Sequence, residues 1–216
     1  MDEELSIINA NTRNEKIRNF FINNKNKIIF GIIILVIIVA AVYSFDRYLT
    51  NQKKEISDNY NSIIIEYSEN SKNETANKLI DIISKKDPTY SPLSLYFIID
   101  NDLVSDKKVV FNLFEIIIND TSLDKEIKNL VIYKKALFYV AEIDDNENEL
   151  LDILNPLINS ESVWKSHALY LMGEYYFSKN QKQKAKEFYE KIIASENTNP
   201  DINKEVQKRL NRDFSE

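Results

Sequence analysis

The sequence contains no cysteine. Disulfide bridges, thiol nucleophiles, thiolate metal ligands and a lipidated N-terminal cysteine are therefore excluded. The chain has one histidine, His167, so a Ser-His-Asp triad would have to use it. Two glycines in 216 residues leave no room for a glycine-rich phosphate loop, and no HExxH motif occurs. The sequence therefore predicts a protein that is not an enzyme, with no catalytic residues, no metal site and no cofactor.

One acidic loop could suggest a calcium site. It carries Asp144, Asp145, Glu147 and Glu149. A calcium-binding loop of the helix-loop-helix kind needs glycine at its sixth position and glutamate at its twelfth. Glu149 and Asn155 stand at those positions instead. We therefore expect a solvated loop that caps the following helix.

Helix breakers are also scarce, with two glycines and four prolines in the whole chain. This scarcity argues against a turn-rich sandwich or barrel and predicts an all-α fold with long helices. The net charge is −6; residues 1–27 contribute +1 and the remainder therefore carries −7. Because phosphate contacts need a basic face, an acidic domain of this kind is not expected to bind nucleic acid.

A long uncharged run, Ile28–Phe45, is the strongest signal in the chain. Its 18 residues would form a helix of roughly 27 Å, close to the hydrocarbon thickness of a bilayer. Tyr43 and Tyr48 can lie at the far interface. A buried core helix is the alternative, but apolar residues cover every face of the run. A cleaved signal peptide fits less well, because the run is long and no small-residue cleavage site follows it. We therefore expect a transmembrane helix over residues 28–45.

The basic residues on either side of this run predict its orientation. Five precede it (Arg13, Lys16, Arg18, Lys25 and Lys27), and three follow it within a similar length (Arg47, Lys53 and Lys54). Lys and Arg accumulate on the cytoplasmic side of membrane helices. We therefore expect residues 1–27 to be a cytoplasmic segment and residues 46–216 to form a domain on the other side of the membrane.

Two segments of this domain share one spacing of large and small apolar residues over about 34 residues. The first, starting at Ser57, has Tyr60, Ile63, Ile64, Tyr67, Ala76, Ile80, Ile83 and Pro88. The second, starting at Ser166, has Leu169, Met172, Gly173, Tyr176, Ala185, Tyr189 and Ile192. The small residues would let two helices approach closely, and the larger ones would fill the gap to the next pair. This pattern resembles the tetratricopeptide repeat, a hairpin of two helices.

The pattern predicts repeats near 57–90, 91–124, 129–162 and 166–199, and an amphipathic final helix at 200–212 as a cap. The two middle repeats fit less well. The third needs a shift of about four residues, with its helices near Asn129–Glu142 and Glu149–Ile158. An irregular helical bundle whose residues match the register by chance is the alternative.

In the last predicted repeat, the residues that would face the inner groove are His167, Tyr170, Glu174 and Phe177. Aromatic faces provide contact area and the polar groups set orientation, a mixture that suits an extended peptide or an exposed apolar segment. We therefore predict these four residues as partner contacts. Trp164, just before this repeat, could anchor a partner, although packing against the preceding helix pair is the simpler interpretation.

The whole layout resembles the ancillary subunit of the bacterial SecYEG translocon. The chain has a short charged start (Asp2-Glu3-Glu4, then Arg13-Asn14-Glu15-Lys16), one membrane helix, and a degenerate repeat domain. The closest stretch is Val163–Ile193, with Trp164, Ala168, Leu171, Gly173, Gln181 and Ala185. The sequence departs from the family pattern at Asn197, where proline is expected, and in the weak middle repeats.

The resemblance implies a single-pass protein of the bacterial inner membrane, with a cytoplasmic N-terminus and a periplasmic domain. It implies as partners translocon subunits, a membrane-anchored periplasmic chaperone of the prolyl-isomerase type, and secreted chains as they emerge. It gives no catalytic residues, and no small-molecule substrate is expected. The alternative function is a structural scaffold for another envelope assembly, such as division or outer-membrane biogenesis.

Overall fold

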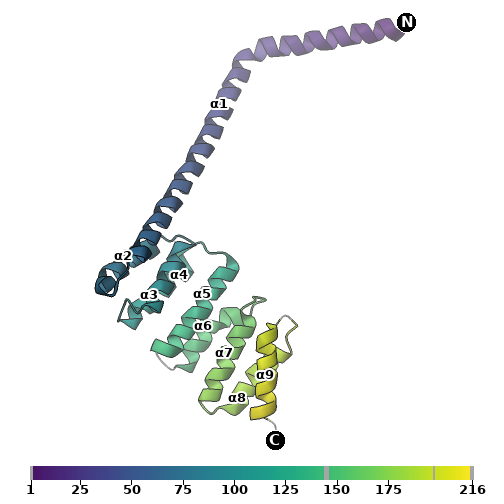
Figure 1. The fold of residues 1–216 in the computed structure, drawn as a ribbon. Helices are drawn as coiled ribbons and strands as arrows, with labels where there is room; N and C mark the ends of the chain where they lie inside the picture. The colour runs from purple at the N-terminus through teal and green to yellow at the C-terminus, as the bar shows by residue number, and fades with distance from the viewer. Residues whose placement is uncertain (1, 144–145, 197, 215–216) are drawn as a thin grey trace. The chain divides into compact units, whose positions relative to one another are not determined.

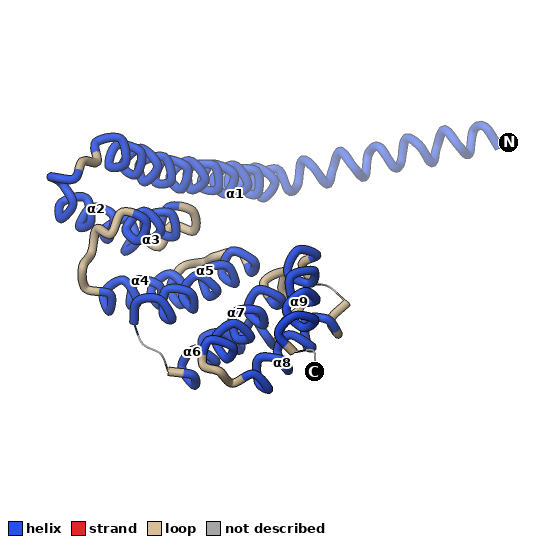
Figure 2. The backbone as a smooth tube through the Cα atoms, turned by 60° about the horizontal axis from the view of Figure 1, so that its bottom comes forward, coloured by secondary structure: helices blue, strands red, loops and turns tan. Residues whose placement is uncertain are grey.

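The computed structural model describes residues 2–143, 146–196 and 198–214, with side chains described from Arg13 onward. The chain divides into two compact units, Met1–Glu55 and Ile56–Glu216. Within the described ranges the regular structure is helical and includes no strand (Figures 1 and 2). The all-α prediction, with a long apolar N-terminal helix followed by helical hairpins, is therefore confirmed.

The first unit consists of helix α1, which runs over Asp2–Glu66 and so continues into the second unit. Its apolar window reaches a mean hydropathy of 3.0, and none of that window is buried against the rest of the described chain. Leu35 is 60% exposed and Ile37 61%. The segment is therefore not a core helix of the domain, and α1 is long and apolar enough to cross a membrane. The inner membrane and the cytoplasmic N-terminus stay predictions.

The second unit begins with the last turns of α1 and continues as an array of antiparallel helices. Its further helices are α2 (Lys72–Ser84), α3 (Tyr90–Asp100), α4 (Lys107–Asp120), α5 (Lys125–Phe138), α6 (Glu147–Ile158), α7 (Lys165–Ser178), α8 (Lys182–Ile193) and α9 (Pro200–Asp213). A short 3₁₀ helix, Glu69–Ser71, precedes α2, and a π-helical turn, Tyr139–Ile143, extends α5. Neighbouring helices in the chain pack on one another, and α9 packs on both α7 and α8 (Figure 2).

Short polar side chains set where several helices begin. Asp106, Asn146 and Asn199 stand just before α4, α6 and α9, and each accepts a hydrogen bond from a backbone N–H of the first turn, at 2.9, 3.0 and 2.9 Å. Such bonds satisfy donors that have no partner inside the helix. Pro200 takes the first position of α9, where its fixed φ is favourable. Where α7 ends, Asn180 adopts a positive φ of 59°, a left-handed conformation that asparagine tolerates.

The predicted repeat ranges can be compared with these helices. The range 57–90 contains the end of α1 and all of α2. The ranges 91–124 and 166–199 contain α4 and α8, but α3 and α7 each begin one residue before them, and the cap predicted at 200–212 ends one residue before α9 does. The helix expected near 129–142 begins four residues earlier, at Lys125, and ends in the π-helical turn. Asp124 accepts the first helical hydrogen bond there, from the N–H of Lys128 at 2.9 Å. Of the acidic loop, Asp144 and Asp145 lie outside the described residues, as does Asn197.

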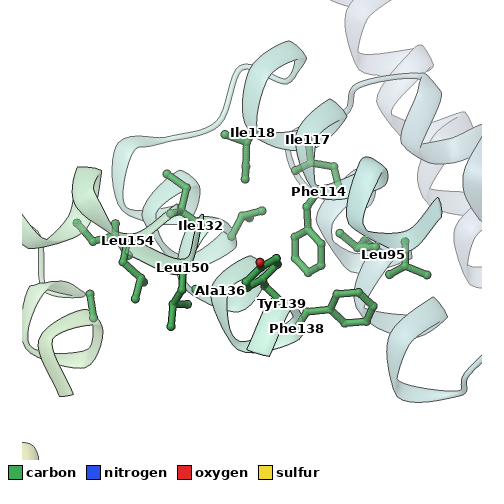
Figure 3. Close-up of a cluster of buried hydrophobic side chains, with 14 of the residues drawn as sticks. Leu95, Phe114, Ile117, Ile118, Ile132, Ala136, Phe138, Tyr139, Leu150 and Leu154 are labelled. Carbon is green, nitrogen blue, oxygen red and sulfur yellow. The ribbon is translucent and has the colours of Figure 1, made fainter. Parts of the chain in front are cut away.

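One hydrophobic core connects the hairpins. Figure 3 shows its central part, in which large side chains of α3, α4, α5 and α6 converge: Leu95, Phe114, Ile117, Ile118, Ile132, Ala136, Phe138, Tyr139, Leu150 and Leu154. Each of these is at most 8% exposed. The core of one hairpin is thus closed by the next, which is how an array of repeats buries surface that a single hairpin would leave open.

The closest helix approach lies between α7 and α8. Gly173 is fully surrounded, and a Cβ atom there would lie 2.7 Å from Cδ1 of Tyr189 and closer still to Cε1. Tyr189 is itself 0% exposed. The expectation that small residues at this register position allow close packing is therefore met at Gly173. The same register places Ala185 on the facing helix, and it is also fully buried.

Candidate functional site

A pocket of about 580 Å³ opens between α3, α4, α5 and the π-helical turn. Its lining combines apolar and aromatic side chains with five charged ones: Tyr96, Ile98, Ile99, Asp100, Asp102, Val104, Lys107, Val110, Phe114, Lys134, Leu137, Phe138, Ala141 and Glu142. Several of these residues, such as Phe114 and Phe138, also belong to the hydrophobic core. This size and this mixture of an apolar wall with a few polar groups are typical of sites that bind part of a ligand or peptide.

Tyr96 supplies an unusual polar group to this pocket. Its hydroxyl is buried and, among the described residues, has no hydrogen-bond partner. Burial raises the pKa of Tyr96 to about 12, so the hydroxyl keeps its proton at neutral pH. Lys134 of α5 places its Nζ 4.5 Å from the centre of the Tyr96 ring. Because a buried hydroxyl normally finds a partner, this unpartnered donor is an exception in the described part of the domain.

Lys107, at the start of α4, organises the rim of the pocket. Its Nζ lies 2.6 Å from Oδ1 of Asp102, in the loop after α3, and 3.7 Å from Oε2 of Glu142, in the π-helical turn. The hydrogen bond from Lys107 holds the pKa of Asp102 below its usual range, and Asp102 raises the pKa of Lys107. Both charges are therefore retained near neutral pH. One ammonium group thus links three segments around the opening.

An exposed apolar side chain adjoins this pocket on α5. Leu137 lines the pocket and is 40% exposed. The next outward position, Val140, is 38% exposed. An exposed leucine alone needs no explanation, but one at the edge of an apolar pocket adds to a continuous contact surface. A partner could therefore bury Leu137 together with the pocket wall.

Of the four predicted groove residues, His167 lies in an aromatic cluster. Its ring is 4.9 Å from that of Trp164 and 5.6 Å from that of Tyr133. Trp164 stacks on Tyr133 of α5, with ring centres 5.7 Å apart and planes inclined by 25°. The interpretation that Trp164 packs against the preceding helix pair is therefore the one observed. Burial lowers the pKa of His167, so the ring is neutral at pH 7.

Tyr170, the second predicted residue, is half-buried and lies beside Tyr189, with ring centres 6.1 Å apart. Burial raises its pKa, as does the charge of Glu174. It therefore stays protonated at neutral pH.

The other two predicted groove residues contact α9. One carboxylate oxygen of Glu174 accepts from the hydroxyl of Tyr189 at 2.6 Å, and the other accepts from Nη2 of Arg209 at 2.6 Å. The ring of Phe177 lies 5.8 Å from that of Phe214, and Cζ of Arg209 lies 5.2 Å from its centre. The Glu174 side chain is still 30% exposed, so a partner could reach it beside Arg209 of α9. The role of the four residues as partner contacts stays a prediction.

The pocket between α3 and α5 was not anticipated as a site from the sequence. The signal that could have found it lies in the third predicted repeat. There Ile132, Ala136 and Tyr139 mark the inward face, so the apolar residues Leu137 and Val140 fall on the outward face. Unexplained apolar residues on the outward face of a repeat helix indicate a contact surface.

Comparison with known protein families, with characterised proteins and with solved structures found no match to this chain. Its function is therefore argued from the geometry above. Within the described ranges, no three His, Asp or Glu side chains are grouped in a way that could hold a metal ion. The remaining acidic-loop residues bond to neighbouring helices: Glu147 accepts from Lys184 of α8 and Tyr176 of α7, both at 2.9 Å, and Glu149 accepts from Tyr139 at 3.1 Å.

Proposed function

We propose that this protein is a membrane-anchored protein-binding module that assists protein export. The observation that carries the proposal is the open pocket between α3 and α5, which has the exposed Leu137 in its lining. The apolar segment of α1 supports the anchoring. The array of helical hairpins supports binding, because such arrays present extended surfaces to other proteins.

The pocket suits an apolar side chain of a partner segment. Leu137 and Ile99 offer apolar surface to such a side chain. Burying one large apolar side chain contributes about 1.5–3 kcal/mol. By itself this corresponds to an affinity weaker than about 1 mM. Such a contact is transient unless several side chains bind or the membrane anchor raises the local concentration. A weak contact of this kind suits secreted chains, because they must be released again.

The export setting rests on the resemblance described above. In this proposal the chain is a single-pass protein of the bacterial inner membrane, its N-terminus is cytoplasmic, and its domain lies in the periplasm. Its partners are translocon subunits, a periplasmic chaperone and emerging secreted chains. The acidic domain agrees with protein partners rather than nucleic acid.

The test is site-specific photo-crosslinking of the full-length protein in cells. A photoreactive amino acid replaces Leu137 at the pocket edge, and, in the matched control, Ile193 on α8, which is similarly exposed at 39% and does not line the pocket. We expect crosslinks from position 137 to translocon subunits or secreted chains, and none of these from position 193. Crosslinks at 137 only to division or outer-membrane assembly proteins would replace export by the scaffold function. Identical products from both positions would refute the pocket as the binding site.

A further inference from the structure

The stretch of α1 just before the apolar segment, Arg13–Lys27, has an organisation that anchoring alone does not require. It carries five basic residues against one acidic residue, Glu15. Of its four exposed large apolar side chains, three share one face: Ile17 is 47% exposed, Phe20 59% and Phe21 55%, whereas Ile22, at 60%, lies on the other. A positively charged flank is enough to orient a membrane helix. The exposed aromatic residues within that flank therefore need a separate explanation.

Three of these apolar residues form one stripe along the helix. Ile17, Phe20 and Phe21 follow the spacing i, i+3 and i+4, which places them on the same face. The next position on that face is Asn24, whose side-chain amide donates to the backbone carbonyl of Phe20 at 2.9 Å. This internal bond satisfies part of the amide and lowers the polarity of the stripe. The rings of Phe20 and Phe21 meet edge to face at 5.9 Å and so form one aromatic surface.

Four of the five basic residues flank this stripe, two on each side, whereas Arg13, four residues before Ile17, lies on the face of the stripe itself. Lys16 lies one turn from Phe20, and Lys27 lies two turns beyond it on the same flank. On the other flank, Arg18 and Lys25 lie three residues before and four residues after Phe21. Lys and Arg in these positions can lay their aliphatic stems along the apolar surface and keep their charges in a polar layer.

The opposite face is mostly polar. Glu15, Asn19 and Asn26 lie there, with Ile22 as the one apolar residue among them. A helix with an apolar stripe, basic flanks and a polar back is the kind that lies in the plane of a membrane interface. Figure 1 shows α1 changing direction within the Met1–Glu55 unit, between its purple N-terminal part and the stretch that follows. Such a change is needed if one part lies along the surface while the next crosses the bilayer.

We propose that residues 13–27 form an interfacial helix that binds the anionic headgroups of the bilayer that α1 crosses. The stripe of Ile17, Phe20 and Phe21 enters the boundary between headgroups and acyl chains, and the flanking Lys and Arg contact lipid phosphates. The charge complementarity selects anionic phospholipid, and the membrane segment that starts at Ile28 holds the stripe at the surface. This surface is separate from the pocket between α3 and α5, and its failure would leave the export proposal untouched.

The test exploits the lack of cysteine, because single-cysteine variants of the full chain carry one label only. A nitroxide spin label is placed at Asn24, on the stripe, or at the matched position Asn26, on the polar back. Each protein is reconstituted into nanodiscs of phosphatidylcholine alone or of phosphatidylcholine with phosphatidylglycerol. Collisions of the label with oxygen report membrane contact, and collisions with a water-soluble nickel chelate report water contact.

With phosphatidylglycerol present, we expect the label at Asn24 to favour oxygen and the label at Asn26 to favour the nickel chelate. The contrast should weaken in phosphatidylcholine alone. Replacing Arg18 and Lys25 by glutamine should lower the ratio of membrane-bound to water-exposed populations of residues 13–27 by about fivefold for each charge removed. Replacing Lys53 and Lys54, basic residues of α1 beyond the apolar segment, should leave the contrast unchanged.

Three outcomes would overturn the proposal. Equal nickel collisions at Asn24 and Asn26 would show that the segment stands in water. A contrast that phosphatidylglycerol does not strengthen would show that the headgroup charge plays no part. A contrast that persists after Arg18 and Lys25 are replaced, but is lost with Lys53 and Lys54, would place the lipid contact on the other flank.

Discussion

The close approach of α7 and α8 gives the sharpest prediction about the domain. Substituting Gly173→Ala would add a methyl group 2.7 Å from Cδ1 of Tyr189 and closer still to Cε1. The ring of Tyr189 has little freedom to move away. It is 0% exposed, its hydroxyl donates to Glu174 at 2.6 Å, and the ring of Phe214 lies 5.9 Å away.

Two opposing effects set the size of the change. Overpacking a well-filled core costs about 1–3 kcal/mol. Alanine is favoured over glycine inside a helix by about 1 kcal/mol. Because Tyr189 is held on several sides, we expect overpacking to dominate, with a net loss of about 1–2 kcal/mol in the free energy of unfolding. For a domain of this size, such a loss lowers the melting temperature by roughly 2–8 °C.

The assay is thermal and urea unfolding of the full-length protein in detergent, followed by circular dichroism. The control is Gly31→Ala at the chain's other glycine, where nothing lies within 4 Å of an added Cβ, so the melting of the domain should not change. A second substitution, Tyr189→Leu, removes the obstructing ring, and Gly173→Ala should then cost less than it does alone. An unchanged or raised melting temperature for Gly173→Ala by itself would refute the close helix approach.

Three further predictions concern polar groups. The buried hydroxyl of Ser94 has no partner among the described residues. In urea melts, Ser94→Ala should therefore leave the free energy of unfolding unchanged or raise it by about 1 kcal/mol. A decrease in the free energy of unfolding by more than about 1 kcal/mol would contradict the absence of a partner. Glu174→Ala removes the acceptor of Arg209 and should lower the free energy of unfolding by about 1–3 kcal/mol, mainly by loosening α9, which hydrogen exchange would detect. Burial raises the pKa values of Tyr96 and Tyr176 to about 12 from 10.0. Their stabilising effect is therefore complete below pH 10 and lost as the pH rises toward 12, and tyrosinate absorbance should appear together with unfolding; ionisation near pH 10 with the fold intact would contradict this.

The sequence predicted the class of fold because its signals were strong and local. The scarcity of glycine and proline, the uncharged run Ile28–Phe45 and the turn residues before the helices each act over a few residues. Asn146 caps α6 in the acidic loop that was expected to cap the following helix, and Asp106 caps α4 in the same way. Gly173 lies at a close helix contact, as its register position required. Such features depend on local backbone and burial demands, which a single sequence records.

The contacts of the candidate site could not be predicted in the same way, because they depend on helices distant in the chain. Glu174 and Phe177 lie on the predicted helix, α7, yet no local pattern indicated that Arg209 would reach Glu174. An amphipathic cap was expected from the stripe Ile202, Val206 and Leu210, but that stripe does not specify which face of α7 the helix covers. Register fixes which residues share a face, whereas packing decides what lies against it.

The weakness of the middle repeats and the position of the pocket have a common physical cause. In the last repeat, Gly173 lets the facing helix come so near that the ring of Tyr189 contacts the backbone and no space remains. In the phase that starts at Ser91, the corresponding position holds Ile98, which is 0% exposed and forms part of the pocket wall. A large side chain at a position that demands a small one keeps helices apart, and the space left beside it is lined by apolar atoms. A departure from the repeat pattern is therefore not only a loss of signal: in this chain it coincides with the pocket between α3 and α5.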